Sequence, residues 1–371
     1  MNVLLLSGQL GSGGAPRVCH QIVRHLPDDI EVTVAYLGGR DGLVNKFERE
    51  GISVRRLGAR SLSLASVRAL NRHLRTHEYD LVHTHMISAG LIGRLLATRH
   101  GLPVVHTVHT NYTMRPIKAK VPDVLSAPFG DISVCVSESV AQSLPRYYQS
   151  ETTVIYNCID VDNIRARGKV PWENLEWTTN LDPNAPIVAN VARYDPKKRR
   201  IDLVDSVRAI TDKFPNVQLV LTGRRGDRQQ RLAKRARELG VEDNVHFVGF
   251  VENPQSVYRH ADVIALSSEA EGFSIGMLEA MAHRRPIVAS KIPAFIDALG
   301  EEYPGFVCVQ SPQELGVEIC KTISNESHRT ELISTICERI DQFSGKQAAK
   351  AYCKVYRSQL MDKDESKSVS D

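Results

Sequence analysis

Residues 3–16 read Val-Leu-Leu-Leu-Ser-Gly-Gln-Leu-Gly-Ser-Gly-Gly-Ala-Pro, an apolar run that leads through a glycine-rich turn into a helix-like segment. A short apolar run bounded by glycines is typical of a buried strand. Pro16 suits the first turn of a helix, where the N–H that proline lacks would have no partner. The stretch therefore predicts a strand–turn–helix unit in which Gly13 and Gly14 let the backbone approach an anion closely.

This turn does not match the common nucleotide-binding patterns. Aligning Gly11-x-Gly13 with the dinucleotide fingerprint places Pro16 where the third glycine belongs. No acidic residue ends the second expected strand, and a Walker lysine is absent. A nicotinamide-dependent oxidoreductase is therefore disfavoured, and a tight turn without a ligand stays an alternative for this loop.

Strand and helix patterns alternate outward from this stretch along the whole chain, which predicts parallel sheets covered by helices on both faces. Strands are expected at 3–6, 31–37, 53–57, 81–84, 104–108, 132–136 and 153–155, and again at 187–191, 218–222, 245–248, 263–266, 286–289 and 306–309. Helices are expected at 15–26, 44–50, 66–77, 88–100 and 345–360. The fold class is α/β with two such sheets.

The length of 371 residues also favours two domains, since single cores stop growing at roughly 250–300 residues. Residues 160–186 show no clean period and look like the junction. We expect a first domain at 1–165 and a second at 166–344. We further expect a helix at 345–361 and a charged, disordered tail at 362–371.

Composition narrows the class of protein. With 42% hydrophobic and 24% charged residues the chain is typical of a globular protein, and it has neither a basic leader nor an apolar run of ~20 residues. The seven cysteines are scattered and predict buried thiols in a reducing compartment, so a cytoplasmic location is expected. The net charge of +4 arises in residues 1–160, which fits an anionic ligand or membrane surface better than nucleic acid.

Two groups in the second half are candidates for binding an anionic substrate. Arg193 and Lys198 flank a turn containing Pro196, so both cations could converge on one diphosphate, although a solvated basic loop is the alternative. Glu271-Gly-Phe-Ser-Ile-Gly-Met-Leu-Glu279 reads as a turn into an apolar helix. A carboxylate such as Glu279 is costly among apolar neighbours unless it accepts hydrogen bonds, for example from ribose hydroxyls.

Histidines gather at two expected strand ends in the first half. His109 closes an apolar strand and leads into Thr110-Asn111-Tyr112, so it could donate a hydrogen bond to a ligand hydroxyl. For His83, His85 and His106 a structural role in the core is the alternative.

Taken together, these motifs make the chain resemble a family 4 retaining glycosyltransferase of the GT-B fold, in which two Rossmann-like domains face a central cleft. The likeness rests on motifs spread over nearly the whole length. They are Gly11-Ser-Gly-Gly-Ala-Pro16, Val154-Ile-Tyr-Asn-Cys-Ile-Asp160, Arg193 with Lys198, Leu221-Thr-Gly223, Val245-His-Phe-Val-Gly-Phe250, Ala261-Asp-Val263 and the Glu271/Glu279 pair.

The resemblance implies a role for each matching residue. Arg193 and Lys198 would hold the donor diphosphate, and His109 and Glu271 would contact the transferred sugar, so these four are the candidate catalytic residues. The remaining positions, which would bind the donor, are Gly13, Gly14, Gly223, Val251, Gly272, Phe273, Ser274, Ile275 and Glu279. The last helix would cross back to the first, acceptor-side domain. Three sites depart from the family pattern: Cys158, Arg284 and residues 292–294, of which the last alters a loop that in the family often lies close to the donor sugar or acceptor.

The expected function is transfer of a sugar from a UDP- or GDP-linked donor to an acceptor hydroxyl in polysaccharide, glycolipid or lipid-linked glycan synthesis. Retention comes from the resemblance, and the lack of an Asp-x-Asp motif at a strand end favours chemistry without a metal or cofactor. A nucleotide-sugar hydrolase or epimerase and a non-catalytic nucleotide-sugar-binding scaffold stay alternatives.

The acceptor side offers one further pattern. Residues 112–121 mix cations with apolar side chains and could contact an anionic membrane surface peripherally. Pro116 and Pro122 argue against a long amphipathic helix there, so a solvated loop is the alternative.

Overall fold

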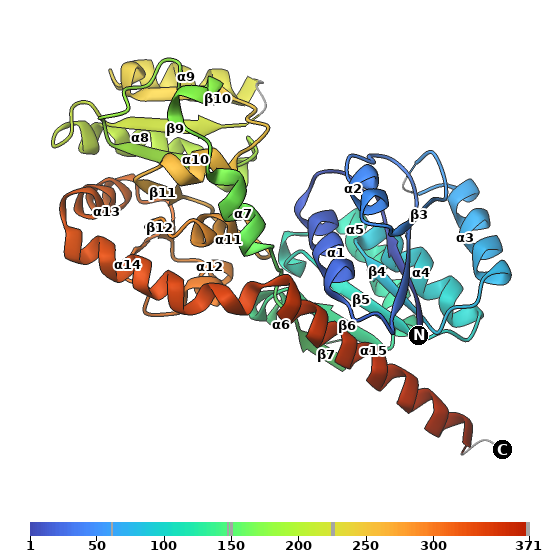
Figure 1. Ribbon diagram of the computed structural model, residues 1–371. Helices are drawn as coiled ribbons and strands as arrows, with labels where there is room; N and C mark the ends of the chain where they lie inside the picture. Colours follow the sequence, from blue (N-terminus) through green and yellow to red (C-terminus); the bar gives the residue numbers. More distant parts are fainter. Residues whose placement is uncertain (61, 147, 149–150, 224–226, 369–371) are drawn as a thin grey trace. The chain divides into compact units, whose positions relative to one another are not determined.

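The computed structural model describes residues 1–60, 62–146, 148, 151–223 and 227–368, which form two compact α/β units (Figure 1). The first unit contains Met1–Cys158 together with the chain from Phe343 onward, and the second contains Ile159–Gln342. The boundary therefore falls just before helix α7 (Val161–Gly168), whereas the sequence suggested residue 165.

The first unit is a seven-stranded parallel sheet in the order β3-β2-β1-β4-β5-β6-β7. Its strands are β1 (Asn2–Ser7), β2 (Glu31–Tyr36), β3 (Ser53–Arg56), β4 (Leu81–His85), β5 (Val104–Val108), β6 (Ile132–Cys135) and β7 (Glu151–Val154). Its helices are α1 (Gly14–His25), α2 (Val44–Arg49), α3 (Leu64–Thr76), α4 (Ile87–Arg99), α5 (Ile117–Ser126), α6 (Glu138–Gln142) and α15 (Gly345–Ser368), with 3₁₀ turns η1 (Tyr112–Met114) and η2 (Ala127–Phe129).

The second unit is a six-stranded parallel sheet in the order β10-β9-β8-β11-β12-β13. Its strands are β8 (Ile187–Val191), β9 (Gln218–Thr222), β10 (Val245–Gly249), β11 (Val263–Leu266), β12 (Ile287–Ser290) and β13 (Phe306–Val307). Besides α7, its helices are α8 (Arg200–Thr211), α9 (Asp227–Glu238), α10 (Gln255–His260), α11 (Ile275–Ala282), α12 (Pro293–Leu299), α13 (Pro312–Ser324) and α14 (Glu326–Arg339). Short 3₁₀ turns are η3 (Trp172–Asn174), η4 (Glu176–Thr178), η5 (Pro196–Lys198), η6 (Glu242–Asn244) and η7 (Ile340–Phe343).

Both faces of the first sheet are covered, as the alternation of side chains along β1 shows. Leu4 and Leu6 pack in a buried cluster with residues of α3 and α4, whereas Leu5 packs on the opposite side with residues of α1 and α2. Successive side chains of a strand point to opposite faces, so an uninterrupted apolar run is what a doubly covered strand needs. The fold class and every strand expected from the sequence are thus confirmed.

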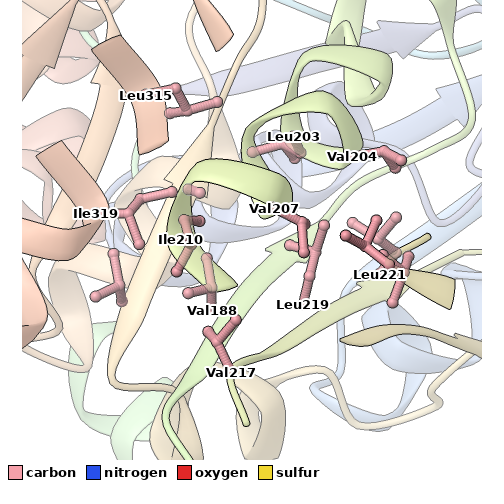
Figure 2. Close-up of a cluster of buried hydrophobic side chains, with 14 of the residues drawn as sticks. Val188, Leu203, Val204, Val207, Ile210, Val217, Leu219, Leu221, Leu315 and Ile319 are labelled. Carbon is pink, nitrogen blue, oxygen red and sulfur yellow. The ribbon is translucent and has the colours of Figure 1, made fainter. Parts of the chain in front are cut away.

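The core of the second unit follows the same rule. Figure 2 shows side chains of α8, among them Leu203 and Val207, packed on Val188 of β8 and Leu219 of β9. Helix α13 adds Ile319 to the same cluster. The carboxyl ends of β8, β9 and β11 are therefore held at one edge of a rigid sheet.

The last helix, α15, belongs to the first unit and packs on α1 (Figure 1). Its buried Tyr356 hydroxyl lies 2.6 Å from Nδ1 of His83, and its Tyr352 hydroxyl lies 2.9 Å from Oγ1 of Thr107. Both partners lie on central strands, so α15 completes the polar interior of this sheet.

Two expectations need correction. Helix α15 continues to Ser368 instead of ending near 361, because extending a helix that is already nucleated costs little for residues such as Lys363 and Glu365. Residues 369–371 of the expected tail lie outside the described residues. The cysteines are all free, but Cys308 is exposed and Cys337 is half-buried. Among the described residues, no helix combines the length and apolarity needed to cross a membrane.

Removing the Tyr356 hydroxyl should destabilise the first unit. Tyr356→Phe leaves the fully buried His83 Nδ1 without its partner, a loss of about 1–3 kcal/mol in the free energy of unfolding. Hydrogen exchange of the β4 amides and chemical denaturation measure this loss. Tyr79→Phe removes the same group from a half-buried pair with His73, 2.8 Å apart, and should cost less. Equal losses in the two variants would contradict the prediction.

Candidate functional site

The carboxyl edge of the second sheet carries most of the residues singled out in the sequence. Arg193 follows β8, Gly223 follows β9, and Ser267 and Ser268 follow β11. Helix α11 begins a few residues later, after Glu271. Parallel strands end at the same edge of their sheet, where α/β proteins bind their ligands.

Lys198 and Glu271 are brought together here although 73 positions separate them in the sequence. The Lys198 ammonium forms an ion pair with Oε1 of Glu271, and the Ser268 hydroxyl donates to the same oxygen at 2.9 Å. Ser267 holds the turn that carries the lysine, since its hydroxyl donates to the carbonyl of Lys198 at 2.9 Å. A cation and a carboxylate are thus fixed side by side at the strand ends.

Arg193 behaves differently from Lys198. Its side chain is 86% exposed, and the carboxylate beside it is Asp195, with Nη2 and Oδ2 3.9 Å apart. The structure therefore pairs the two expected diphosphate ligands with different carboxylates and does not show their heads converging. An exposed pair of this kind holds the arginine only weakly.

Two further cations of the basic run, Arg199 and Arg200, are structural. Arg199 makes two hydrogen bonds of 2.7 Å to the carboxylate of Asp202. Arg200 is buried and donates to Oδ1 of Asn190 at 2.8 Å, to the carbonyl of Ala192 at 2.6 Å and to the carbonyl of Thr222. Burial lowers the pKa of Arg200 to about 10. Arg200 thereby joins the ends of β8 and β9 just where the site begins.

Sequence reasoning did not separate Arg200 from its neighbours. The signal available was Asn190, a polar residue inside an otherwise apolar strand, which needs a buried hydrogen-bond partner.

Glu279 is buried on α11 within a short polar chain. The Gln255 amide donates to Oε1 of Glu279 at 3.0 Å, and Nε2 of His283 lies 3.0 Å from Oε1 of the same glutamine. Burial, together with nearby arginines, lowers the pKa of His283 to about 4, so the imidazole is neutral and donates through Nε2–H. The expected hydrogen bonds to this carboxylate therefore come in part from the protein itself.

The turn before α11 offers backbone rather than side chains. Phe273 is buried, so its ring serves the core, and Ser274 caps the helix by accepting from the amide of Met277 at 3.4 Å. The N–H groups at the start of the helix, including that of Ile275, carry the partial positive charge of a helix N-terminus. Gly272 lies three residues before Ile275 and is half-buried.

Gly223 is required by its surroundings. It adopts φ +149°, and a Cβ there would lie 2.9 Å from the carbonyl oxygen of Ala192. Its amide donates to the carbonyl of Gly249 at 2.7 Å, which ties the end of β9 to that of β10. Val251 lies two residues after Gly249 and is half-buried. Both positions lie at the expected edge.

In the first unit, Gly13 is the N-cap of α1 and Gly14 its first residue, and both are exposed. A Cβ added at Gly13 would meet only Cδ of Pro16, at 4.0 Å. The packing of the protein therefore does not demand glycine at residue 13.

His109 lies at the end of a chain of buried polar groups. Its Nε2 is 2.8 Å from Nδ1 of His85, whose ring lies against that of His83 with centroids 4.1 Å apart. Burial, with a smaller contribution from Arg115, lowers the pKa of His109 to about 4. Burial also lowers the pKa of His85, so both rings are neutral at neutral pH.

The surroundings of His85 assign the protons of this pair. Among the described residues, the buried Nε2 of His85 has no hydrogen-bond partner. An unpaired buried N–H is rarer than an unpaired acceptor, so the proton belongs on Nδ1 and is donated to His109. His109 then carries its own proton on Nδ1, as a donor. The sequence left a structural role as the alternative for His85, and its spacing from His83 was the only signal.

Arg284, one of the departures from the family pattern, adopts φ +52° at the end of α11, in the left-handed region that favours glycine.

Two glycosyltransferase family models match consecutive segments of this chain. The family described as Glycosyltransferase Family 4 matches residues 12–163, and the one described as Glycosyl transferases group 1 matches residues 173–338. The two matches fall on the first and second units.

Curated relatives agree with this result. The D-inositol 3-phosphate glycosyltransferase of Segniliparus rotundus is 27% identical over 303 residues, which are 76% of this chain and 67% of the relative. The putative glycosyltransferase EpsD of Bacillus subtilis is 25% identical over 325 residues, 81% of this chain and 84% of the relative.

Solved structures share the fold. Anabaena HepE in complex with UDP superposes with a TM-score of 0.81 at 21% identity, covering 96% of this chain and 100% of that one. Sucrose-phosphate synthase of Thermosynechococcus elongatus gives 0.78 at 19% identity, covering 98% and 100%. With this architecture and a family match on each unit, the chain belongs to family 4 of the glycosyltransferases and has the GT-B fold.

Proposed function

We propose that this glycosyltransferase takes its sugar from a UDP- or GDP-linked donor and transfers it with retention to an acceptor hydroxyl, without a metal. The observation that carries the proposal is the group formed by Lys198, Glu271 and Ser268 at the carboxyl edge of the second sheet. HepE, which shares the fold, was solved with UDP and with UDP-glucose, so UDP is the first nucleotide to test.

Charge is the chemical difficulty of the reaction. Negative charge grows on the departing diphosphate while C1 becomes positive, and preorganised cations stabilise the leaving group best. Lys198 is held ready by Glu271, and the exposed Arg193 can turn toward the phosphates without breaking a strong contact. The amides at the start of α11 add partial positive charge.

The other positions would hold the rest of the donor. Glu279 would accept hydrogen bonds from the ribose, and Glu271 with the backbone of Gly272 to Ile275 would hold the sugar. Gly223 and Val251 would lie at the base. In the first unit, Nδ1–H of His109 would donate to the sugar, and Gly13 and Gly14 would lie near the phosphates.

Glu271 is poorly suited to act as a nucleophile. Its Oε1 already accepts from Ser268 and pairs with Lys198, which lowers its reactivity toward C1. We therefore favour transfer on one face of the sugar. The bond from C1 to the phosphate oxygen breaks, the bond to the acceptor oxygen forms on the same side, and the acceptor proton moves to the phosphate oxygen.

The proposed acceptor is a glycan, a lipid-linked glycan or another hydroxyl compound of cell-surface polysaccharide or glycolipid synthesis. The named relatives include an inositol phosphate glycosyltransferase and EpsD, so the family likeness alone leaves the acceptor class open.

A binding panel tests the donor. UDP or GDP should raise the unfolding temperature of the wild-type chain in a thermal-shift assay, because a ligand that binds only the folded state stabilises it. ADP and NAD serve as comparison ligands. Lys198→Ala should lose most of the shift, whereas Lys197→Ala, a neighbouring cation on the same turn, should keep it. No shift with any nucleotide would overturn the proposed donor.

Turnover tests the leaving-group site. Arg193→Ala, Lys198→Ala and Glu271→Ala should each lower kcat by about 10²-fold or more, the usual loss for one charge-stabilising group. Lys197→Ala should change kcat less than about twofold, since the proposed chemistry gives Lys197 no role. EDTA should have no effect. Wild-type rates in the three variants would remove these residues from the mechanism, and release of free sugar without acceptor would identify a hydrolase.

The pH dependence tests the histidine pair. Because the pKa of His109 lies at about 4, its imidazole stays neutral at pH 5.5 and above, and kcat/KM should show no ionisation of this residue up to about pH 8. His85→Leu removes the fixed proton donor and should lower kcat/KM by about tenfold or more. His85→Asn retains an N–H near the position of Nδ1 and should recover much of the loss. Equal losses in the two variants, with unchanged unfolding temperatures, would contradict the role of His85.

A further inference from the structure

Helix α5 presents an apolar row of side chains on its outward face. Ile117 is 78% exposed, Val121 53% and Leu125 67%, and Phe129 in the following turn is 42% exposed. Residues four apart lie on one side of a helix. These four residues, which we call the α5 row, are four of the ten large hydrophobic side chains that are exposed in the described part of the chain.

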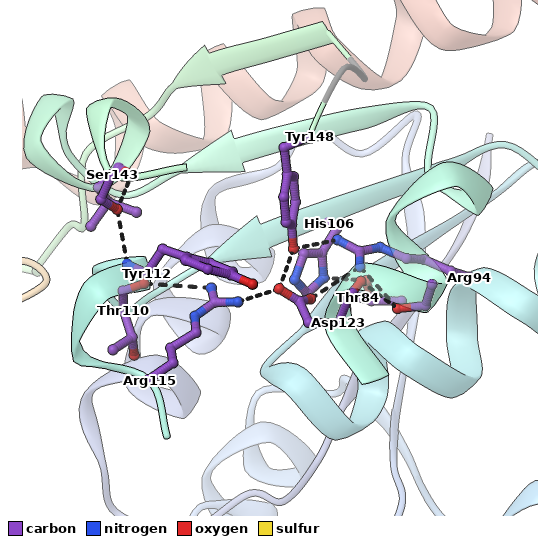
Figure 3. Close-up of polar contacts among 11 residues, drawn as sticks. Thr84, Arg94, His106, Thr110, Tyr112, Arg115, Asp123, Ser143 and Tyr148 are labelled. Atoms are coloured by element: carbon purple, nitrogen blue, oxygen red, sulfur yellow. Dashed lines mark hydrogen bonds and ion pairs between the residues drawn. The ribbon is translucent and has the colours of Figure 1, made fainter. Parts of the chain in front are cut away.

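The inward face of α5 is charged, as Figure 3 shows. Asp123 is buried and receives hydrogen bonds from Arg94 of α4, at 3.2 Å, from Arg115, and from the Tyr148 hydroxyl at 2.6 Å. Arg94 also donates to Oγ of Ser126 at 3.2 Å. Surface helices ordinarily turn their apolar face to the core and their charged face to water, so α5 is reversed.

This reversal is fixed by the charged contacts. Turning α5 about its axis to bury Val121 and Leu125 would take Asp123 away from two buried arginines and leave those charges unpaired, which is strongly unfavourable. The interior of the unit therefore holds the α5 row outward.

The charges that α5 itself exposes are positive. Between residues 111 and 130 the only acidic residue is Asp123, which is buried and paired, whereas Lys118 is exposed. Lys120 is half-buried with its ammonium over the ring of Tyr112, 5.2 Å from the centroid. Asp131, two residues after Phe129, is exposed and accepts from the amide of Val104 at 2.6 Å. Helix α5 itself exposes an apolar row and a lysine and has no exposed carboxylate, which complements the boundary between the acyl chains and headgroups of an anionic membrane.

We propose that α5 docks this glycosyltransferase on an anionic lipid bilayer, with the α5 row in the acyl boundary and Lys118 and Lys120 at the headgroups. Docking at the bilayer would make a lipid-linked hydroxyl the acceptor. This assignment of the acceptor rests on the proposed function, whereas the docking itself does not. The short helix, with Pro122 inside it, lies on the surface and does not span the membrane.

Sedimentation of the full chain with vesicles tests the proposal. Wild type should bind vesicles of phosphatidylcholine with about a third phosphatidylglycerol at low salt and lose affinity as salt rises. The variant Ile117→Ser/Val121→Ser/Leu125→Ser should bind at least about tenfold more weakly. Lys118→Ala/Lys120→Ala should weaken binding and flatten the salt dependence. Leu64→Ser/Val317→Ser, at sites 75% and 65% exposed elsewhere, is the matched control and should bind like wild type.

Three results would overturn the docking surface. The first is that wild type does not bind vesicles at low salt. The second is that the α5 variant and the control bind equally well. The third is that wild type self-associates and the α5 variant is monomeric, while vesicle binding is the same for both. The last result, measured by light scattering, would assign the α5 row to a second copy of the chain. Nucleotide thermal shifts are measured on the same samples, so vesicle binding without any nucleotide shift would leave the docking surface standing and reject the donor.

Discussion

All strands of each sheet run parallel, and this constraint decides where polar chemistry can gather. Parallel strands buried on both faces leave no room for solvated groups along their length, so these groups collect where the strands end. In the second unit the turn after β8 supplies Lys198 and the segment after β11 supplies Glu271, and the two meet as an ion pair. Arg200 joins the ends of β8 and β9 by donating hydrogen bonds to Asn190, Ala192 and Thr222. The site is thus a consequence of the sheet as much as of its own residues.

The fold could be derived from the sequence because its signals are local. Each strand is a short apolar run, and each of the first four helices follows a strand as a separate helix-like stretch. Helix α5 was not expected, since Pro116 and Pro122 disfavour a helix taken alone. In the structure Pro116 caps the helix, and the hydrogen bonds from Arg94 and Arg115 to Asp123 hold the turn that Pro122 weakens. Those contacts join residues from three separate segments, and no local pattern encodes them.

The candidate site was predictable by residue type and less so by pairing. The sequence indicated Lys198, Glu271 and Glu279, and the structure places them at one edge of one unit. Arg193 and Arg200 have the same residue type in one basic stretch, and apart from the polar Asn190 in β8 only packing separates the exposed arginine from the buried one. The hydrogen bond between His85 and His109 was likewise not predictable, since it depends on the register of β4 against β5.

The return of the chain to its first unit has a consequence for biosynthesis. Tyr352 and Tyr356 supply buried hydroxyls to Thr107 and His83, so the first sheet lacks part of its interior until residues 352 and 356 have been synthesised. The later unit, whose residues 159–342 are contiguous, emerges whole before that moment. A chain truncated before residue 345 would therefore lack α15 and would be destabilised in its first sheet, far from the site of truncation in the sequence. Quality control of nascent chains would meet a first sheet in which His83 and Thr107 keep their contact with each other but lack the tyrosine hydroxyls.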